Sequence, residues 1–388
     1  MALKAVHVSD VPNLDQVPEN SPLALCSTRF FKGVNDDGDD EVKFGYNLPK
    51  FMVIGHRGSG MNILQSCDPR MKSIQENSIL SFNAASKFRI DFIEFDVQVT
   101  KDDCPVIFHD NFILTEDEGV IVERRVTDLT LAEFLCYGPQ KEPGNVGKNL
   151  FRKTKDGRTF EWRVQNDDPL CTLQEAFKKV EHSIGFNIEL KFDDHMVYTE
   201  EELTHVLQAI MKVVNEYAND RPIIFSSFQP DAAQLIRNLQ NTYPVFFLTN
   251  GGSEIYMDTR RNSLEEAIRV CLTGSLQGIV SEVRAIIRNP GAVTRIKESK
   301  LCLITYGQLN NVPEVACMQH LVGVEGVIVD LVKEITEAIS DYIKPAKDYD
   351  EDSLFVEEAK KQVTTKPRFT QHELSLLLLK ISPELIQS

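Results

Sequence analysis

The sequence predicts a (β/α)8 barrel, in which a closed parallel sheet is surrounded by helices. Short apolar runs bounded by turn-forming residues alternate with stretches of helical periodicity. The alternation repeats eight times over about 290 residues, close to the usual size of about 250 residues for this fold. The expected strands are 51–55, 92–97, 186–190, 223–227, 245–248, 278–281, 301–306 and 327–330.

Helical patterns fill the intervals between these strands, as alternating β/α units require. One further apolar run, 105–108, begins only a few residues after the second strand. Because a parallel neighbour needs a crossover of a dozen or more residues, this run predicts an antiparallel β-hairpin arm after strand 2. The expected helices are 78–87, 172–181, 200–217, 230–240, 263–272, 291–299 and 313–321.

A doubly wound open sheet is the alternative fold. It would place a glycine-rich phosphate loop with the pattern G-x-G-x-x-G directly after its first strand. The sequence at that point is Gly55-His56-Arg57-Gly58, which lacks the pattern. The barrel is therefore the preferred prediction.

Three segments fall outside the repeating pattern of the barrel, which we expect over 49–340. Residues 1–48 are predicted to be an N-terminal extension. Residues 138–169, before the third barrel strand, form an insertion rich in Lys and Arg. We expect a solvated loop there, with a docking surface for an anionic headgroup or membrane as the alternative. Residues 341–388 are predicted to be a charged linker and a short apolar C-terminal helix packed on the barrel.

Composition excludes several classes of partner. Lys and Arg number 42 and Asp and Glu 58, so the formal net charge of −16 argues against nucleic acid. The eight cysteines form no C-x-x-C pair, which favours reduced thiols. We expect no membrane span, because no apolar run approaches about 18 residues. The N-terminus lacks a secretory apolar region and is acidic, so cytoplasm is the expected compartment.

Barrels of this fold place their active sites at the carboxyl ends of the strands. Acidic residues interrupt the apolar strands near these ends. Glu94 and Asp96 are two residues apart, so both side chains leave the same face of one strand. Two adjacent carboxylates repel unless a cation lies between them. With Glu189 from the neighbouring strand they provide three hard oxygen ligands, suited to Mg²⁺ or Ca²⁺. The alternative is a structural ion-pair network with Arg57 and Lys191.

Two histidines, His56 and His109, occupy predicted strand ends near these carboxylates. An ordinary imidazole pKa of about 6.5 suits proton transfer near neutrality. Arg57 and Lys191 add positive charge at the same rim, which suits a phosphate group. This combination predicts metal-assisted cleavage of a phosphoester with acid–base help from the two imidazoles.

Several local motifs together resemble the glycerophosphodiester phosphodiesterase family. The resemblance covers residues 51–338, and the whole sequence is similar to the plant soluble branch of that family. The motifs are G-H-R-G (55–58), E-N-S (76–78), the run from D-F-I-E-F-D to I-F-H-D (91–110), I-E-L-K (188–191), S-S-F (226–228) and G-V-E-G-V-I-V-D (323–330).

The resemblance implies a TIM barrel that hydrolyses glycerophosphodiesters, such as glycerophosphocholine or glycerophosphoethanolamine, to sn-glycerol 3-phosphate and an alcohol. It implies a divalent cation, with Mg²⁺ favoured over Ca²⁺. The implied general acid and base are His56 and His109. The implied metal ligands are Glu94, Asp96 and Glu189, and the implied substrate-binding residues are Arg57, Lys191, Glu76, Asn77 and Tyr306.

The sequence departs from the family pattern at two short elements. Ser78 replaces the Thr of the E-N-T element, which keeps a hydroxyl able to cap the following helix. Tyr306 and Gly307 stand where the family commonly has a W-T-V-N element. The headgroup preference therefore stays open. Lysophospholipase D-type activity, a non-catalytic scaffold and a plastid location are the remaining alternatives.

Overall fold

The computed structural model describes residues 51–342, apart from residue 143. The predicted N-terminal extension and C-terminal helix lie outside the described residues. No helix within the described part of the chain is long and apolar enough to cross a bilayer.

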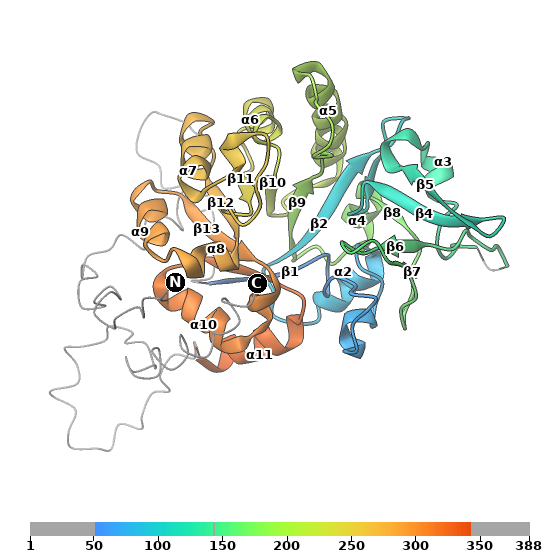
Figure 1. Cartoon of the computed structure of the whole chain (residues 1–388), viewed down its shortest axis with the longest axis horizontal. Helices are drawn as coiled ribbons and strands as arrows, with labels where there is room; N and C mark the ends of the chain where they lie inside the picture. Colours follow the sequence, from blue (N-terminus) through green and yellow to red (C-terminus); the bar gives the residue numbers. More distant parts are fainter. Residues whose placement is uncertain (1–50, 143, 343–388) are drawn as a thin grey trace, which may run out of the picture.

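Eight parallel strands close into a barrel in the described part of the chain, which confirms the predicted fold (Figure 1). Each strand pairs with the next, and the last strand returns to the first through the pair Met52↔Gly326. The barrel strands are β1 (Met52–Gly55), β2 (Phe92–Val99), β9 (Gly185–Leu190), β10 (Ile223–Ser227), β11 (Val245–Thr249), β12 (Gly278–Glu282), β13 (Cys302–Tyr306) and β14 (Gly326–Val329).

Helices follow the strands and cover the outside of the barrel with their apolar faces (Figure 1). Thr172 and Thr199 begin two of them with capping boxes, in which side chains satisfy the first free backbone amides. The α-helices are α2 (Ile79–Ala85), α3 (Leu131–Phe134), α4 (Leu173–Lys179), α5 (Glu200–Tyr217), α6 (Pro230–Leu239), α7 (Leu264–Thr273), α8 (Val283–Arg288), α9 (Gly291–Glu298), α10 (Pro313–Val322) and α11 (Val332–Tyr342). The short 3-10 helices are η3 (Pro69–Lys72), η4 (Val126–Asp128), η5 (Thr259–Arg261) and η6 (Gln308–Asn311).

The barrel interior explains where the acidic residues of β2 lie. Met52, Ile54 and Phe92 pack with apolar residues of the other strands in one buried cluster. Because side chains alternate along a strand, Glu94 and Asp96 share the face of Phe92. The two carboxylates therefore lie above the apolar interior, toward the carboxyl end of the barrel.

The antiparallel arm is present as predicted. Strand β3 (Pro105–Ile107) pairs with β2 through Val97↔Ile107, and β8 (Cys171–Thr172) pairs with β3 on its other side. Between β3 and β8 the chain forms a separate antiparallel sheet beside the barrel (Figure 1). This inserted sheet consists of β4 (Phe112–Asp117), β5 (Val120–Arg125), β6 (Phe151–Lys153) and β7 (Thr159–Glu161), in the order β5-β4-β6-β7.

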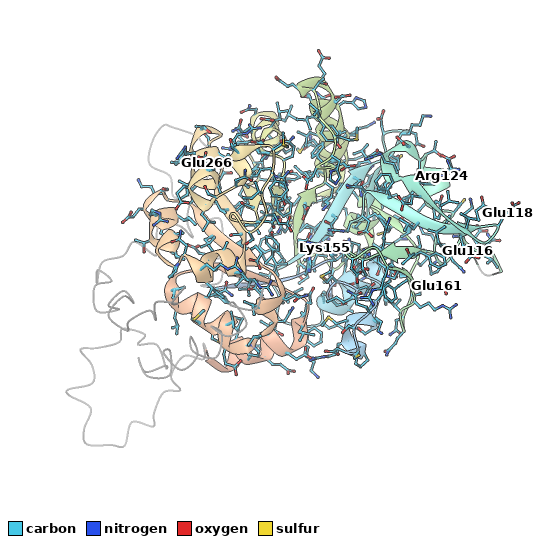
Figure 2. The ribbon with its side chains drawn as sticks, viewed as in Figure 1. Glu116, Glu118, Arg124, Lys155, Glu161 and Glu266 are labelled. Atoms are coloured by element: carbon cyan, nitrogen blue, oxygen red, sulfur yellow. The ribbon has the colours of Figure 1, made fainter. Side chains whose placement is uncertain are left out.

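The expectation of a solvated loop over 138–169 is therefore wrong for the part that forms β6 and β7. Strands of three residues are too short for the alternation of apolar and polar side chains to be read. The sheet also has its own apolar cluster, which includes Phe134 and Trp162. Figure 2 shows Lys155, at the turn after β6, on the side of the sheet near the barrel, and its Nζ lies 3.1 Å from Glu254 Oε1.

One buried arginine stabilises the wall of the barrel. Arg221 is 2% exposed and donates to the carbonyl oxygens of Glu181 and Ile184 at 2.8 and 2.6 Å. It donates to Val180 O at 3.0 Å, and its guanidinium carbon lies 4.1 Å from the centre of the Phe186 ring. Its side chain thus satisfies three carbonyls that precede β9.

Arg221→Met is expected to lower the free energy of unfolding by about 3 kcal/mol, because three carbonyl oxygens lose their donor while much of the apolar contact stays. Urea denaturation followed by circular dichroism measures this. The control is Arg269→Met, since Arg269 is an exposed residue paired with Glu266, and we expect a change below about 0.5 kcal/mol. Equal stability of the two variants would contradict the prediction.

Candidate active site

A cavity of about 780 Å³ opens at the carboxyl end of the barrel. It receives side chains from the strand ends of the barrel and from the inserted sheet. Active sites of (β/α)8 barrels occupy this end. The residues expected from the sequence that line the cavity are His56, Arg57, Glu94, His109, Glu189, Lys191 and Tyr306.

Three carboxylates form a buried cluster, of which Glu94 and Glu189 line this cavity and Asp96 does not. Glu94 and Asp96 come from β2, and Glu189 lies beside Asp96 in the register of β9. One oxygen from each residue lies within 4.8 Å of the others. Glu94 Oε1 and Asp96 Oδ1 are buried and have no hydrogen-bond partner among the described residues. Hard oxygen donors with unsatisfied atoms fit a divalent cation such as Mg²⁺ or Ca²⁺.

The electrostatics of this acidic cluster agree with a cation-binding role. Burial and the Asp96 carboxylate raise the pKa of Glu94 to about 8, and burial also raises the pKa of Glu189. Burial acts to raise the pKa of Asp96 too, but the positive charges around it hold that pKa below its usual range. A cation in the cluster would relieve this repulsion.

His56 follows β1 and is held by Asp330, at the end of β14. The imidazole Nδ1 lies 2.7 Å from Asp330 Oδ1. A carboxylate only accepts, so Nδ1 carries the proton of this bond and Nε2 faces Glu94, whose Oε2 is 3.9 Å away. Burial lowers the pKa of His56, but Asp330 raises it by more. Asn311 and Met61 donate to the Asp330 carboxylate at 2.8 and 2.9 Å and fix it.

His109 follows the antiparallel arm and is held in the same way. Its Nδ1 lies 2.7 Å from Asp110 Oδ1. Burial lowers its pKa to about 4, with Arg57 and Lys191 acting in the same direction. The two imidazoles are therefore oriented alike by carboxylates, while their pKa values move in opposite directions, a pattern typical of acid–base pairs.

Arg57 and Lys191 lie beside the acidic cluster. Lys191 Nζ is 3.0 Å from Glu189 Oε1 and 3.6 Å from Asp96 Oδ1. Arg57 donates through Nη1 to Glu76 Oε1 at 2.7 Å. The ion pairs expected as an alternative to the metal site are thus present together with the carboxylate cluster. Both cations also line the cavity, where they can face an anionic substrate.

Glu76 and Asn77 lie behind the cavity wall rather than on it. Asn77 Nδ2 donates to Asp96 Oδ2 at 2.9 Å, and Glu76 accepts from Arg57. Arg57 and Asn77 have φ of 49° and 53°, a region that costs non-glycine residues free energy. The bond from Asn77 N to Arg57 O, 3.0 Å long, joins the two strained residues.

The far side of the cavity carries aromatic rings. Phe228, after β10, meets Tyr306 edge to face with ring centres 6.0 Å apart. The Tyr306 hydroxyl donates to Asn250 Oδ1, and burial raises its pKa well above the usual value. Tyr256 also lines this side and stacks against Arg261, whose guanidinium carbon is 3.7 Å from the ring centre.

Three residues that contact the site side chains were not among the predicted site residues. Asp110 and Asp330 orient the histidines, and Arg152 of the inserted sheet contacts Asp110. Local signals existed for two of them, since Asp110 directly follows His109 and Asp330 ends the last strand. No spacing distinguished Arg152 from the other basic residues of the insertion.

A barrel that brings together a carboxylate cluster, two carboxylate-held imidazoles and two cations has the site of a phosphoric ester hydrolase. Comparison with known proteins gives the family. The sequence profile described as the glycerophosphoryl diester phosphodiesterase family matches residues 56–334. The chain therefore belongs to this family, and it is an enzyme of the phosphoric diester hydrolase class.

Two plant relatives match all or nearly all of this chain, and a fungal relative matches about three quarters of it. It is 58% identical over 388 residues to the chloroplastic glycerophosphodiester phosphodiesterase GDPD1 of Arabidopsis thaliana, covering 100% of both chains. It is 59% identical to the glycerophosphodiester phosphodiesterase GDPD3 of the same plant, over 95% of this chain and 99% of that relative. The glycerophosphocholine phosphodiesterase GDE1 of Candida albicans is 33% identical over 77% of this chain, which spans 29% of that longer protein.

Solved structures share the barrel. A glycerophosphodiester phosphodiesterase from Parabacteroides distasonis superposes with a TM-score of 0.52 at 20% identity, covering 76% of this chain and 99% of that one. An Oleispira antarctica phosphodiesterase, in complex with the product sn-glycerol-3-phosphate, superposes with a TM-score of 0.52 at 20% identity. The superposition covers 76% of this chain and 97% of that one. At 20% identity, these superpositions establish a shared fold.

Proposed function

We propose that this chain hydrolyses glycerophosphodiesters, such as glycerophosphocholine and glycerophosphoethanolamine, to sn-glycerol 3-phosphate and an alcohol. The observation that carries the proposal is one cavity lined by two imidazoles, each held by its own carboxylate, and by two members of the acidic cluster. The names of the Arabidopsis and Candida relatives support the substrate class.

Glu94, Asp96 and Glu189 would hold a divalent cation, and Mg²⁺ is our first choice with Ca²⁺ as the alternative, since both take hard carboxylate oxygens. When bound, the cation supplies electrostatic stabilisation of the charge that develops on the phosphoryl oxygens. Arg57 and Lys191 would bind the same group from the cavity wall. Their fixed positions beside the cluster make the site selective for a phosphate diester over a neutral ester.

His56 and His109 would form the acid–base pair of an in-line displacement at phosphorus. One imidazole takes the proton of the nucleophile, and the other gives a proton to the leaving alkoxide. Asp330 and Asp110 keep both Nδ1 atoms protonated, so each Nε2 is the atom available for proton transfer. Two nucleophiles fit this arrangement, water or the glycerol hydroxyl of the substrate, and trapping of a cyclic glycerophosphate distinguishes the second.

Glu76 and Asn77 take a supporting role in this proposal, in place of the substrate contact expected from the sequence. Glu76 holds the Arg57 guanidinium, and Asn77 holds the Asp96 carboxylate. Their burial behind the wall favours this assignment. Both residues then act on substrate only through the side chains that they orient.

Tyr306 would form the wall for the glycerol or headgroup. Tyr306→Ala is expected to raise KM for glycerophosphocholine about tenfold, with a smaller fall in kcat, because the ring packs on substrate away from the reacting atoms. Tyr306→Phe keeps the ring and should stay within about threefold of wild type. Initial rates over a range of substrate concentrations test this, and an equal effect of the two variants would contradict it.

The cavity also offers a specific reason to assay lysophospholipids. Phe112 and Leu114 of the inserted sheet line it together with Phe192 and Phe228, giving apolar surface that an acyl chain could contact. Lysophospholipase D-type activity is therefore the second candidate function. Comparing kcat/KM for glycerophosphocholine and lysophosphatidylcholine decides between them.

The decisive assay measures sn-glycerol 3-phosphate release from glycerophosphocholine by the purified chain. Activity should disappear with EDTA and return with Mg²⁺, and more weakly with Ca²⁺. Turnover that EDTA leaves intact would remove the cation from the proposal. Absence of turnover on both substrates with either cation, from protein with a cooperative unfolding transition, would overturn the proposed function.

For location we propose the plastid, with cytoplasm as the alternative expected from the sequence. The support is the match over 100% of both chains to a relative named chloroplastic. A fluorescent fusion at the C-terminus of the full chain, expressed in leaf cells, tests it. Signal outside plastids would return cytoplasm as the preferred location.

A further inference from the structure

Arg152, in the middle of β6, reaches from the inserted sheet into the active site. Its Nε donates to Asp110 Oδ2 at 2.8 Å, and its Nη2 donates to Glu76 Oε1 at 2.8 Å. Nη1 donates to Glu76 Oε2 at 3.1 Å and to the carbonyl of Asn62 at 3.3 Å. The guanidinium carbon lies 3.6 Å from the centre of a Trp162 ring. Only 12% of the side chain is exposed.

This geometry links the inserted sheet to the proposed acid–base pair. Asp110 accepts from Arg152 Nε at Oδ2, and its Oδ1 accepts both from His109 Nδ1 at 2.7 Å and from Arg152 Nη2 at 3.3 Å. Glu76 serves as the anchor of the guanidinium and is itself held by Arg57. Among the described residues, Arg152 makes no hydrogen bond to His109 itself. The hydrogen-bonded route from the arginine to the imidazole runs through the Asp110 carboxylate.

We propose that Arg152 is a positioning residue for the phosphodiester reaction, which fixes Asp110 so that His109 presents Nε2 to the substrate. This inference rests on the proposed function. An imidazole without a fixed carboxylate partner samples other orientations and the other tautomer, and a small displacement of a reacting group is costly in rate. The inserted sheet then forms part of the catalytic apparatus of the barrel.

A purely structural reading of Arg152 makes a different prediction. If the side chain only neutralises two buried carboxylates, a lysine supplies the same charge. The planar guanidinium, in contrast, donates in two fixed directions and stacks on the indole at the same time, which an ammonium group cannot do. Lysine rescue therefore separates the two roles.

The test compares Arg152→Lys and Arg152→Met with wild type on glycerophosphocholine. We expect kcat to fall about 10- to 100-fold in both variants, the scale typical of partners that orient a functional histidine, with KM nearly unchanged. The matched control is Arg158→Met. Arg158 lies on the same β6–β7 hairpin, pairs with Asp156 at 2.7 Å and faces the Phe160 ring, but it is exposed and does not line the cavity. It should keep the wild-type kcat.

Non-additivity provides the second readout. In an Asp110→Asn background, Arg152→Lys should lower kcat by less than about threefold, because both residues act through one imidazole. Wild-type kcat in Arg152→Lys, or losses that multiply in the double variant, would overturn the inference. Unfolding transitions of all variants confirm that folded protein was assayed. A wild-type protein without turnover would overturn the proposed function instead.

Discussion

Replacing His56 by Ala is expected to lower kcat for glycerophosphocholine about 1,000-fold, within the range that a positioned acid or base contributes. The imidazole faces the acidic cluster, and Asp330 holds its orientation at 2.7 Å, so its loss removes a positioned proton-transfer group. His109→Ala should have an effect of the same order. Release of sn-glycerol 3-phosphate under saturating substrate and Mg²⁺ measures both losses.

A third histidine provides the matched control. His205 Nε2 also lies 2.7 Å from a carboxylate oxygen, that of Asp103, but the pair is exposed and outside the cavity. His205→Ala should therefore retain wild-type turnover. If His56→Ala kept more than about a tenth of the activity, its role as acid or base would be excluded.

Binding of a divalent cation is expected to release close to one proton near neutral pH. Burial and Asp96 raise the pKa of Glu94 to about 8, so this carboxyl group holds its proton until a cation displaces it. Raising the pH removes this competing proton, so the affinity for the cation increases with pH. Affinity should rise about tenfold per pH unit below this pKa and level off above it. Calorimetry in two buffers of different ionisation enthalpy counts the protons.

Glu94→Gln should abolish both the proton release and the stabilisation of the folded protein by Mg²⁺. Without cation the variant should be about as stable as wild type at neutral pH, because a neutral amide then replaces a carboxyl group that already holds its proton. Glu325→Gln is the control, since burial raises the pKa of Glu325 as well, but this residue pairs with Lys297 away from the cavity. Proton release that persists in Glu94→Gln would assign the proton to another group.

The barrel was predictable because its strands are buried on both faces and read as continuous apolar runs. The antiparallel arm followed from the short interval between β2 and β3, too short for a crossover. The inserted sheet gave no comparable signal. Its β6 and β7 have three residues each, and β5 exposes Val120 and Ile121 as well as its charged residues.

The site was predictable where chemistry interrupts a regular pattern. Glu94 and Asp96 stand two apart within an apolar strand, and the histidines follow strand ends. Residues that orient the site side chains show no such interruption in the sequence, because their contacts depend on how distant segments pack. Arg152 lies 42 positions after Asp110 and 76 after Glu76, and only the folded inserted sheet brings the three side chains together.

The cavity draws its two walls from different stretches of the polypeptide. The ionisable side chains that we propose for bond cleavage lie between His56 and Lys191, whereas the aromatic wall comes from the ends of β10 and β13, at Phe228 and Tyr306. Selection can therefore vary the two properties separately. Under the proposed function, substitutions confined to the second stretch are expected to change which alcohol is released. A saturation library at the wall positions alone would produce that change in the laboratory while every proton-transfer group stays in place.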